Sequence, residues 1–427
     1  HLLAGRSAFQ GFSPTRMGGA GVDGTDGRLL DCPLFDFLIP VSRLPSATQM
    51  NRLRQLYDAG QSVWLDYIDR AMLHNGALAR LIKDDALMGM TSNPTIFEKA
   101  LAEGKEYDEQ IGAVTGEHTP WQLFELIETD DVRTACDIFA DVYRETNGID
   151  GYVSIEVSPG VADDAAATVA EGQRLWATVD RPNVMVKVPG TTEGAIAVRR
   201  LIADGINVNV TLLFSIDAHA RVIEAYLGGL EDRLAAGKPI DRLASVASFF
   251  VSRVDSEIDK RLDAIAASAG EGVRDGILAL RGRAAVANAK LAYRLFTQLF
   301  SGERWEKLAA AGARVQRPLW ASTSAKNPAY RDVLYVETLI GPHTVNTMPP
   351  ATVDAFRDHG ETARTVDTEW TACEQLFHDL EQAGISMQDV TDKLLADGLA
   401  SFQKSFDTLI AGLERKATAL GKSLVQS

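Results

Sequence analysis

Short apolar runs alternate along most of the chain with longer segments of helical periodicity. A buried strand shows as an apolar run bounded by turn residues, whereas a helix shows as apolar positions spaced by three and four. The runs that predict strands lie at residues 62–68, 87–91, 151–157, 183–188, 207–214, 245–252, 317–322 and 342–347. Strands of this kind, separated by helices, predict a parallel (β/α)8 barrel, an α/β fold with additional helices.

The connections between these runs carry the helical pattern. Between the sixth and seventh strands, one helix face is marked by Val286, Ala289, Tyr293, Phe296 and Phe300. The crossover at 92–150 is long enough for two or more helices. After the last strand, Ser386 and Asp389 resemble a capping box. A second apolar stripe follows it, at Val390, Leu394, Phe402, Phe406, Leu409 and Leu413. Such a stripe usually packs on the core; the alternative is a helix that lies across the barrel mouth.

Polar residues fall on the inward faces of the predicted strands. Side chains alternate between the two faces, so Val184, Val186 and Val188 would face outward, while Met185 and Lys187 would face inward. In the fifth strand Val208, Val210 and Leu212 would likewise face outward. The inward polar positions are Asp66, Ser154, Glu156, Asn207, Asn209, Thr211 and Ser248, with Thr91 and Asn93 at the end of the second strand and Arg253 just beyond the sixth. Because barrels build active sites at the carboxyl ends of their strands, we expect one site there.

Lys187 lies in the middle of an apolar strand. Burial favours the neutral form of an amine, and a neutral amine can attack a carbonyl carbon to form a Schiff base. The alternative is a strand-end lysine that reaches solvent or pairs with a carboxylate. The neighbouring polar residues favour catalysis, since the iminium is an electron sink for cleavage of a carbon–carbon bond. Asp66 would then be the base for that cleavage, and Glu156, aided by Thr211, would shuttle protons through an ordered water.

The remaining polar residues suit a phosphorylated sugar. Asn93 and Asn209 would hydrogen-bond the hydroxyls of the retained carbon fragment. Arg253 would bind a terminal phosphate, whose oxygens match the fork of a guanidinium group. A net charge of −15 opposes binding to nucleic acid or to an anionic membrane, although a local basic pocket can still hold a phosphate.

Composition narrows the class of protein further. No apolar run approaches the roughly 18 residues of a membrane span. Cys32, Cys136 and Cys373 are far apart, which favours reduced thiols in a cytoplasmic protein, and no metal-binding motif is present. Residues 1–49 show no sustained periodicity, so we expect a disordered extension or cloning remnant before a single domain at 50–427.

At these motifs the chain resembles transaldolase, an enzyme family of the pentose phosphate pathway. The resemblance rests on the stretches 64–66 (WLD), 90–94 (MTSNP), 154–157 (SIEV), 186–189 (VKVP), 205–215 (GINVNVTLLFS) and 248–255 (SFFVSRVD). The stretch 205–215 is the most specific of them. Together they span roughly residues 50–350, and the chain looks like the longer bacterial and plant form.

The resemblance implies a (β/α)8 barrel whose Schiff-base lysine lies on the fourth strand. Such an enzyme moves a dihydroxyacetone unit from sedoheptulose 7-phosphate or fructose 6-phosphate to glyceraldehyde 3-phosphate or erythrose 4-phosphate, without a cofactor or metal. The matching motifs assign catalysis to Lys187, Asp66, Glu156 and Thr211, and substrate binding to Thr91, Asn93, Asn209, Ser248, Phe250 and Arg253.

The chain departs from the family pattern after the seventh strand. Many members have there an arginine two residues after a serine, as a second phosphate ligand. Here residues 321–326 read ASTSAK, so Ser322 and Lys326 are the candidates for that role.

Two other functions fit the same residues. A Schiff-base fructose 6-phosphate aldolase would use the same lysine and release free dihydroxyacetone. A non-catalytic sugar-phosphate-binding barrel would be expected to lack Lys187, Asp66 or Glu156, and all three are present. Both a monomer and a homodimer are compatible with the sequence.

Overall fold

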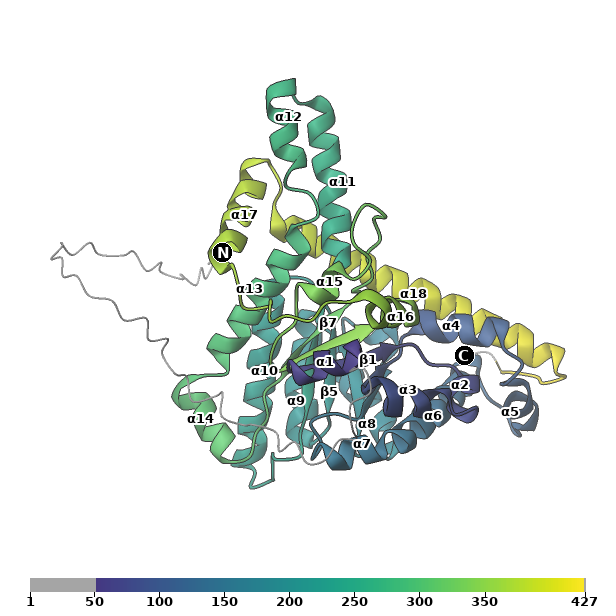
Figure 1. Cartoon of the computed structure of the whole chain (residues 1–427). Helices are drawn as coiled ribbons and strands as arrows, with labels where there is room; N and C mark the ends of the chain where they lie inside the picture. Colours follow the sequence, from purple (N-terminus) through teal and green to yellow (C-terminus); the bar gives the residue numbers. More distant parts are fainter. Residues whose placement is uncertain (1–50, 426–427) are drawn as a thin grey trace, which may run out of the picture. The chain divides into compact units, whose positions relative to one another are not determined.

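The computed structural model describes residues 51–425, in which eight parallel strands form a closed barrel in sequence order (Figure 1). The strands are β1 Gln61–Asp66, β2 Leu87–Thr91, β3 Tyr152–Glu156, β4 Val184–Pro189, β5 Val208–Leu213, β6 Ser245–Phe250, β7 Arg317–Ala321 and β8 Thr344–Met348. β1 pairs with both β2 and β8, which closes the ring. The predicted barrel and its strand positions are thereby confirmed.

Helices cover the outside of the barrel and extend beyond it. In chain order they are α1 Arg52–Asp58, α2 Arg70–His74, α3 Ala77–Asp85, α4 Pro94–Glu103, α5 Asp108–Ala113, α6 Pro120–Ile138, α7 Ala140–Glu145, η2 Pro159–Val161, α8 Ala165–Val179, α9 Thr192–Asp204, α10 Ile216–Ala235, α11 Ser252–Ser268, α12 Glu271–Leu278, α13 Ala284–Leu299, α14 Gly302–Ala310, α15 Leu334–Glu337, α16 Pro350–His359, α17 Trp370–Gln382 and α18 Met387–Ala419. The crossover at 92–150 therefore holds four helices, α4 to α7. Residues 1–49, predicted to be an extension, lie outside the described residues. No helix within 51–425 is long and apolar enough to cross a membrane.

The fifth strand departs from simple alternation near its carboxyl end. Leu212 has a φ of 59°, and the register with β6 shifts between Val210 and Leu213. A left-handed residue interrupts the two-residue period and turns the next side chains. Leu212 was expected to face outward among the surrounding helices. Instead its side chain lies close to Gly398 of α18, where an added Cβ would approach within 2.9 Å. That expectation was wrong because the sequence carries no signal for the irregular backbone.

The opposite end of the barrel is filled by a buried ion pair. Arg317 begins β7, and its Nη2 lies 2.7 Å from Oδ1 of Asp150. Ser62 Oγ accepts a hydrogen bond from Arg317 Nη1 and donates one to Asp150 Oδ2, at 3.0 and 2.8 Å. Trp64 Nε1 also donates to Asp150 Oδ1. Several hydrogen bonds thus offset the cost of burying both charges.

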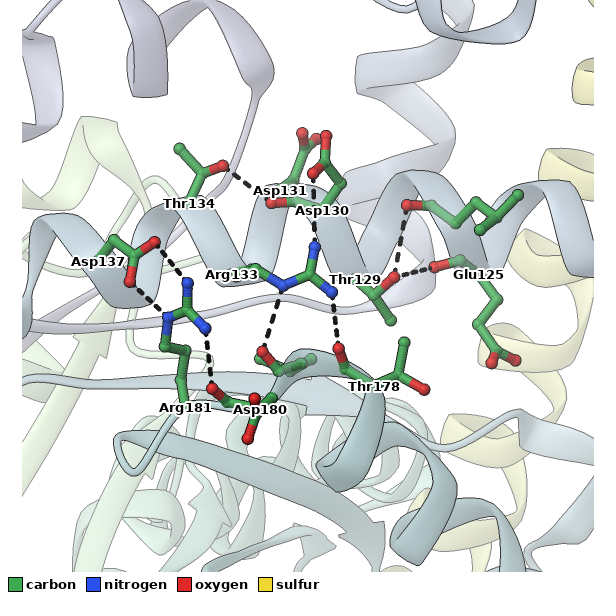
Figure 2. A network of polar contacts seen from close by, with 12 residues as sticks. Glu125, Thr129, Asp130, Asp131, Arg133, Thr134, Asp137, Thr178, Asp180 and Arg181 are labelled. Carbon is green, nitrogen blue, oxygen red and sulfur yellow. Dashed lines mark hydrogen bonds and ion pairs between the residues drawn. The ribbon is translucent and has the colours of Figure 1, made fainter. Parts of the chain in front are cut away.

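α6 is fastened to the chain segment that leads into β4 (Figure 2). Arg133 of α6 donates to the carbonyls of Thr178 and Val179, at 2.6 and 3.3 Å. These carbonyls belong to the last turn of α8 and have no partner within the helix. Arg181, just before β4, makes an ion pair with Asp137 of α6. These contacts fix the start of the strand that carries Lys187.

α18 is a 33-residue helix that lies across the carboxyl ends of several strands (Figure 1). It packs against α4, α6 and α11 and touches β5. Ser386 caps it by accepting from the backbone N–H of Asp389, as the capping pattern predicted. Thr95, just after β2, donates to Ser405 of α18 at 2.9 Å. Both readings of the apolar stripe therefore hold: its residues are largely buried, and the helix lies over the barrel mouth.

Candidate active site

Lys187 points into the barrel and is only 5% exposed. Its Nζ donates hydrogen bonds to Oε2 of Glu156 at 3.2 Å and to the carbonyl of Ser92 at 3.1 Å. In the strand register Glu156 lies beside Lys187, and Lys187 lies beside Asn209. Three inward side chains from β3, β4 and β5 therefore meet at one level. The prediction that these residues face the same interior is confirmed.

Glu156 is buried and has one oxygen to spare. Its Oε1 has no hydrogen-bond partner among the described residues, and the same holds for Oγ1 of Thr211 on the neighbouring face of β5. Burial raises the pKa of Glu156, whereas the charge and hydrogen bond of Lys187 lower it. Buried polar atoms normally have a partner, so atoms left without one mark places where water or substrate binds.

Asp66 ends β1 on the side of the barrel that β2 and β8 border. Thr91 Oγ1 donates to Asp66 Oδ1 at 2.7 Å, and Thr91 is itself bonded to Thr347 Oγ1 of β8 at 2.7 Å. Burial raises the pKa of Asp66, while the positive charge of Lys187 and the Thr91 hydrogen bond lower it. The two carboxyl groups of the site therefore have different partners, as separate acid–base roles require.

Asn209 is held in a short chain of side-chain hydrogen bonds. Its Nδ2 donates to Ser154 Oγ at 2.9 Å, and its Oδ1 accepts from Ser248 Oγ at 2.6 Å. All three residues are buried. The two bonds fix which end of the amide faces each neighbour, so Asn209 presents one orientation to the barrel interior.

Cationic groups gather at the edge of the site. Arg253, in the first turn of α11, lies over the ring of Phe250 with its Cζ 5.3 Å from the ring centre. Lys326 donates to Ser324 Oγ at 2.7 Å. Partial burial lowers the pKa of Lys326, and the positive charges of Arg253 and Lys99 lower it further, while Asp66 raises it. These positive charges thus repel one another, which favours the binding of an anion between them.

Ser322 and Asn93 hold the ends of helices. Ser322 has a φ of 55°, its carbonyl accepts from the backbone N–H of Ser252 at 3.1 Å, and the two Oγ atoms are 3.0 Å apart. Asn93 caps α4, with its Oδ1 accepting from the N–H of Ile96 at 3.1 Å. Its amide nitrogen is not used by that cap. Both residues therefore have a structural role at the mouth of the barrel, in addition to any contact with substrate.

Comparison with known proteins identifies the family. A sequence model described as Transaldolase/Fructose-6-phosphate aldolase matches residues 63–413. The chain is 48% identical over 370 residues to the transaldolase of Thermobifida fusca, a match covering 86% of this chain and 98% of the relative. It is 45% identical over 379 residues to transaldolase 2 of a Nostoc species, covering 87% and 99%. For the transaldolase of Trichodesmium erythraeum the identity is 44% over 374 residues, covering 87% and 98%.

The chain belongs to the transaldolase/fructose-6-phosphate aldolase family.

Some residues at this transaldolase-family site were not anticipated from the sequence. They are the Ser92 carbonyl, Thr347, Lys99 and Phe402. Thr347 lies on β8, two residues after Val345 and therefore on the same face of the strand. Its inward orientation could have been predicted from the alternation of side chains along the strand. Phe402 could not, because its place over the barrel follows only from how α18 packs.

The described residues also bear on metals. Within 51–425 no group of three or more His, Cys, Asp or Glu side chains is arranged to hold a metal ion. That no cofactor is needed stays a prediction.

Proposed function

We propose that this protein is a transaldolase that transfers a dihydroxyacetone unit between sugar phosphates through a Schiff base on Lys187. The observation that carries the proposal is the buried amine of Lys187, hydrogen-bonded to Glu156 at the carboxyl ends of the strands, within the electrostatic influence of Asp66. The family and its relatives named transaldolase support the same chemistry.

In the first stage, the Lys187 amine attacks the ketone carbon of a ketose phosphate. Glu156 takes one proton from the Lys187 ammonium group before the attack and a second from the carbinolamine nitrogen, and it passes both to the oxygen, which leaves as water and gives the iminium. Because burial raises the pKa of Glu156, this carboxyl group can hold a proton between the two transfers. The atoms Glu156 Oε1 and Thr211 Oγ1, which lack protein partners, would hold the water involved.

In the second stage, Asp66 takes the proton from the hydroxyl on the carbon that is released as an aldehyde. The bond between the third and fourth carbons breaks, and its electrons move into the iminium to give an enamine on Lys187. An aldose phosphate then enters, and the steps run in reverse to form the new ketose phosphate. Asn93 and Asn209 would bind the hydroxyls of the retained fragment.

Arg253 and Lys326 would bind the terminal phosphate, with Phe250 supporting the guanidinium group from below. The positive end of the α11 dipole adds to this field, because Arg253 lies in the first turn of that helix. Ser248 and Thr91 would position Asn209 and Asp66, to which they donate hydrogen bonds. The buried free thiols of Cys136 and Cys373 are consistent with a cytoplasmic enzyme.

The test is borohydride reduction of the protein mixed with fructose 6-phosphate, followed by mass spectrometry of the peptides. We expect an added mass on the peptide that contains Lys187, and none in Lys187→Ala. Product analysis with erythrose 4-phosphate should show sedoheptulose 7-phosphate. Release of free dihydroxyacetone without transfer would identify an aldolase instead, and no adduct at all would remove the Schiff-base mechanism.

A further inference from the structure

Phe402 of α18 faces the catalytic amine from outside the barrel. Lys187 Nζ lies 5.8 Å from the centre of the Phe402 ring, and Phe402 is 6% exposed. The other groups near this amine are Glu156 at the end of β3 and the carbonyl of Ser92, the residue that follows β2. The ring therefore supplies an apolar contact on a side of Lys187 that the strands leave for substrate.

The surrounding contacts fix the height of Phe402 above the barrel. One turn earlier, Gly398 lets α18 approach β5 closely, since an added Cβ would lie 2.9 Å from Leu212 Cδ2 and 3.7 Å from Arg253 Nη1. One turn later, Phe406 packs on Trp121 and Phe124 of α6, with ring centres 5.2 and 6.0 Å apart.

We infer that Phe402 determines reaction specificity, by keeping the dihydroxyacetone enamine on Lys187 from hydrolysis until an aldehyde acceptor arrives. This inference rests on the proposed transaldolase function. Phe402, a residue outside the barrel, would thus control whether the enamine is transferred to an aldehyde or hydrolysed by water.

The competing hydrolysis is a defined sequence of steps. Asp66, which carries the proton taken during cleavage, protonates the enamine carbon and regenerates an iminium. Water then adds to the iminium carbon and loses a proton, giving a carbinolamine. The carbon–nitrogen bond breaks as nitrogen gains a proton and the hydroxyl loses one, so dihydroxyacetone and the free Lys187 amine result. The net change is consumption of one water molecule.

The ring opposes this sequence by keeping water away from the reacting carbon. A water molecule that approaches from the mouth must pass α18, and the apolar face of Phe402 offers it no hydrogen bond. The ring also occupies space beside the nitrogen that water would otherwise fill. The enamine thus persists with fewer water molecules near its carbon, and the acceptor aldehyde has time to bind.

The test compares Phe402→Leu with wild type, using fructose 6-phosphate as donor and erythrose 4-phosphate as acceptor. Free dihydroxyacetone and sedoheptulose 7-phosphate are measured in the same reaction. We expect the ratio of hydrolysis to transfer to rise severalfold, because the smaller side chain lets water approach the carbon bound to Lys187. Phe402→Tyr keeps the ring and should stay closer to the wild-type ratio than Phe402→Leu.

Phe406→Leu is the matched control, because it removes an aromatic ring from the same stripe of α18 without touching Lys187. It should lower thermal stability about as much as Phe402→Leu and leave the product ratio unchanged. Equal ratios in Phe402→Leu and Phe406→Leu, with normal transfer in wild type, would overturn the role of Phe402 alone. Wild-type protein that only releases dihydroxyacetone would instead overturn the proposed transferase function.

Discussion

Lys187 and Glu156 lie side by side on β4 and β3, with Nζ 3.2 Å from Oε2 and both side chains buried. A buried pair of this kind is costly to build, since each charge loses its hydration. Here the pairing also places a proton donor and a proton acceptor within a single transfer distance. The strand register alone establishes this relationship, so it does not depend on any loop.

Glu156→Gln should slow formation of the Schiff base. An amide cannot take the proton of the attacking amine, and loss of a general acid–base group typically costs about 10²- to 10⁴-fold. The rate at which borohydride-trapped adduct appears with fructose 6-phosphate measures this step. Asp66→Asn is the comparison variant, because it should trap at a near-normal rate but accumulate the uncleaved six-carbon adduct. Similar trapping rates in wild type and Glu156→Gln would reassign Glu156.

Thr91→Val should move the acid limb of the pH–rate profile to higher pH. The Thr91 hydrogen bond favours the charged form of Asp66 and lowers its pKa, so its removal raises that pKa further above the ordinary value. A base with a higher pKa is protonated, and therefore inactive, at higher pH. The measurement is kcat/KM for fructose 6-phosphate against pH. Thr347→Val is the control, since Thr347 contacts Thr91 and not Asp66, and an equal shift there would argue against this cause.

Arg253→Met should weaken the use of phosphorylated donors selectively. Hydrogen bonds to a charged group contribute about 1.5–3 kcal/mol, which corresponds to roughly a 10- to 200-fold loss in kcat/KM. Lys326→Met should have a smaller effect, because that side chain is more exposed than Arg253. Unphosphorylated fructose, assayed as a poor donor, serves as the internal control. A loss of the same size on fructose would show that Arg253 acts on the barrel rather than on phosphate.

Much of the architecture followed from the apolar pattern, for a physical reason. Strands buried on both faces must be apolar on the outside. The apolar positions Val184, Val186 and Val188 therefore predicted β4 and an inward orientation for Lys187. Leu212 was misplaced because a left-handed backbone conformation carries no periodic signal. The position of Phe402 was equally hidden, since apolar stripes look the same whether a helix packs on the barrel wall or across its mouth.

Arg317→Met should destabilise the fold by about 3–5 kcal/mol, because it leaves Asp150 charged and buried without its partner. Urea unfolding followed by circular dichroism measures the loss. The exposed Arg304, which pairs with Glu224 and Glu231, is the control, and Arg304→Met should cost less than about 1 kcal/mol. Comparable losses in the two variants would mean that burial does not decide the strength of these pairs.

His219 makes the stability of the fold depend on pH. Its ring is fully buried in α10, 5.7 Å from the ring of Phe249. Burial lowers the pKa of His219 to about 4 from an ordinary value of 6.5, against a smaller opposing effect of the Ala292 backbone. The folded state therefore binds this proton less readily than the unfolded state does.

The sign follows from this difference. Above pH 6.5 both states hold a neutral ring and His219 has no pH-dependent effect. As pH falls from 6.5 towards 4, the unfolded state binds a proton at His219 and the folded state largely does not. The free energy of unfolding therefore decreases by roughly 3 kcal/mol. His219→Leu should remove that part of the decrease, so its stability relative to wild type should improve steadily over this window. His359→Asn, at an exposed ring between Asp332 and Asp358, is the control and should not flatten the acid decline. Parallel stability curves for wild type and His219→Leu between pH 4 and 6.5 would show that the folded and unfolded states protonate this histidine equally.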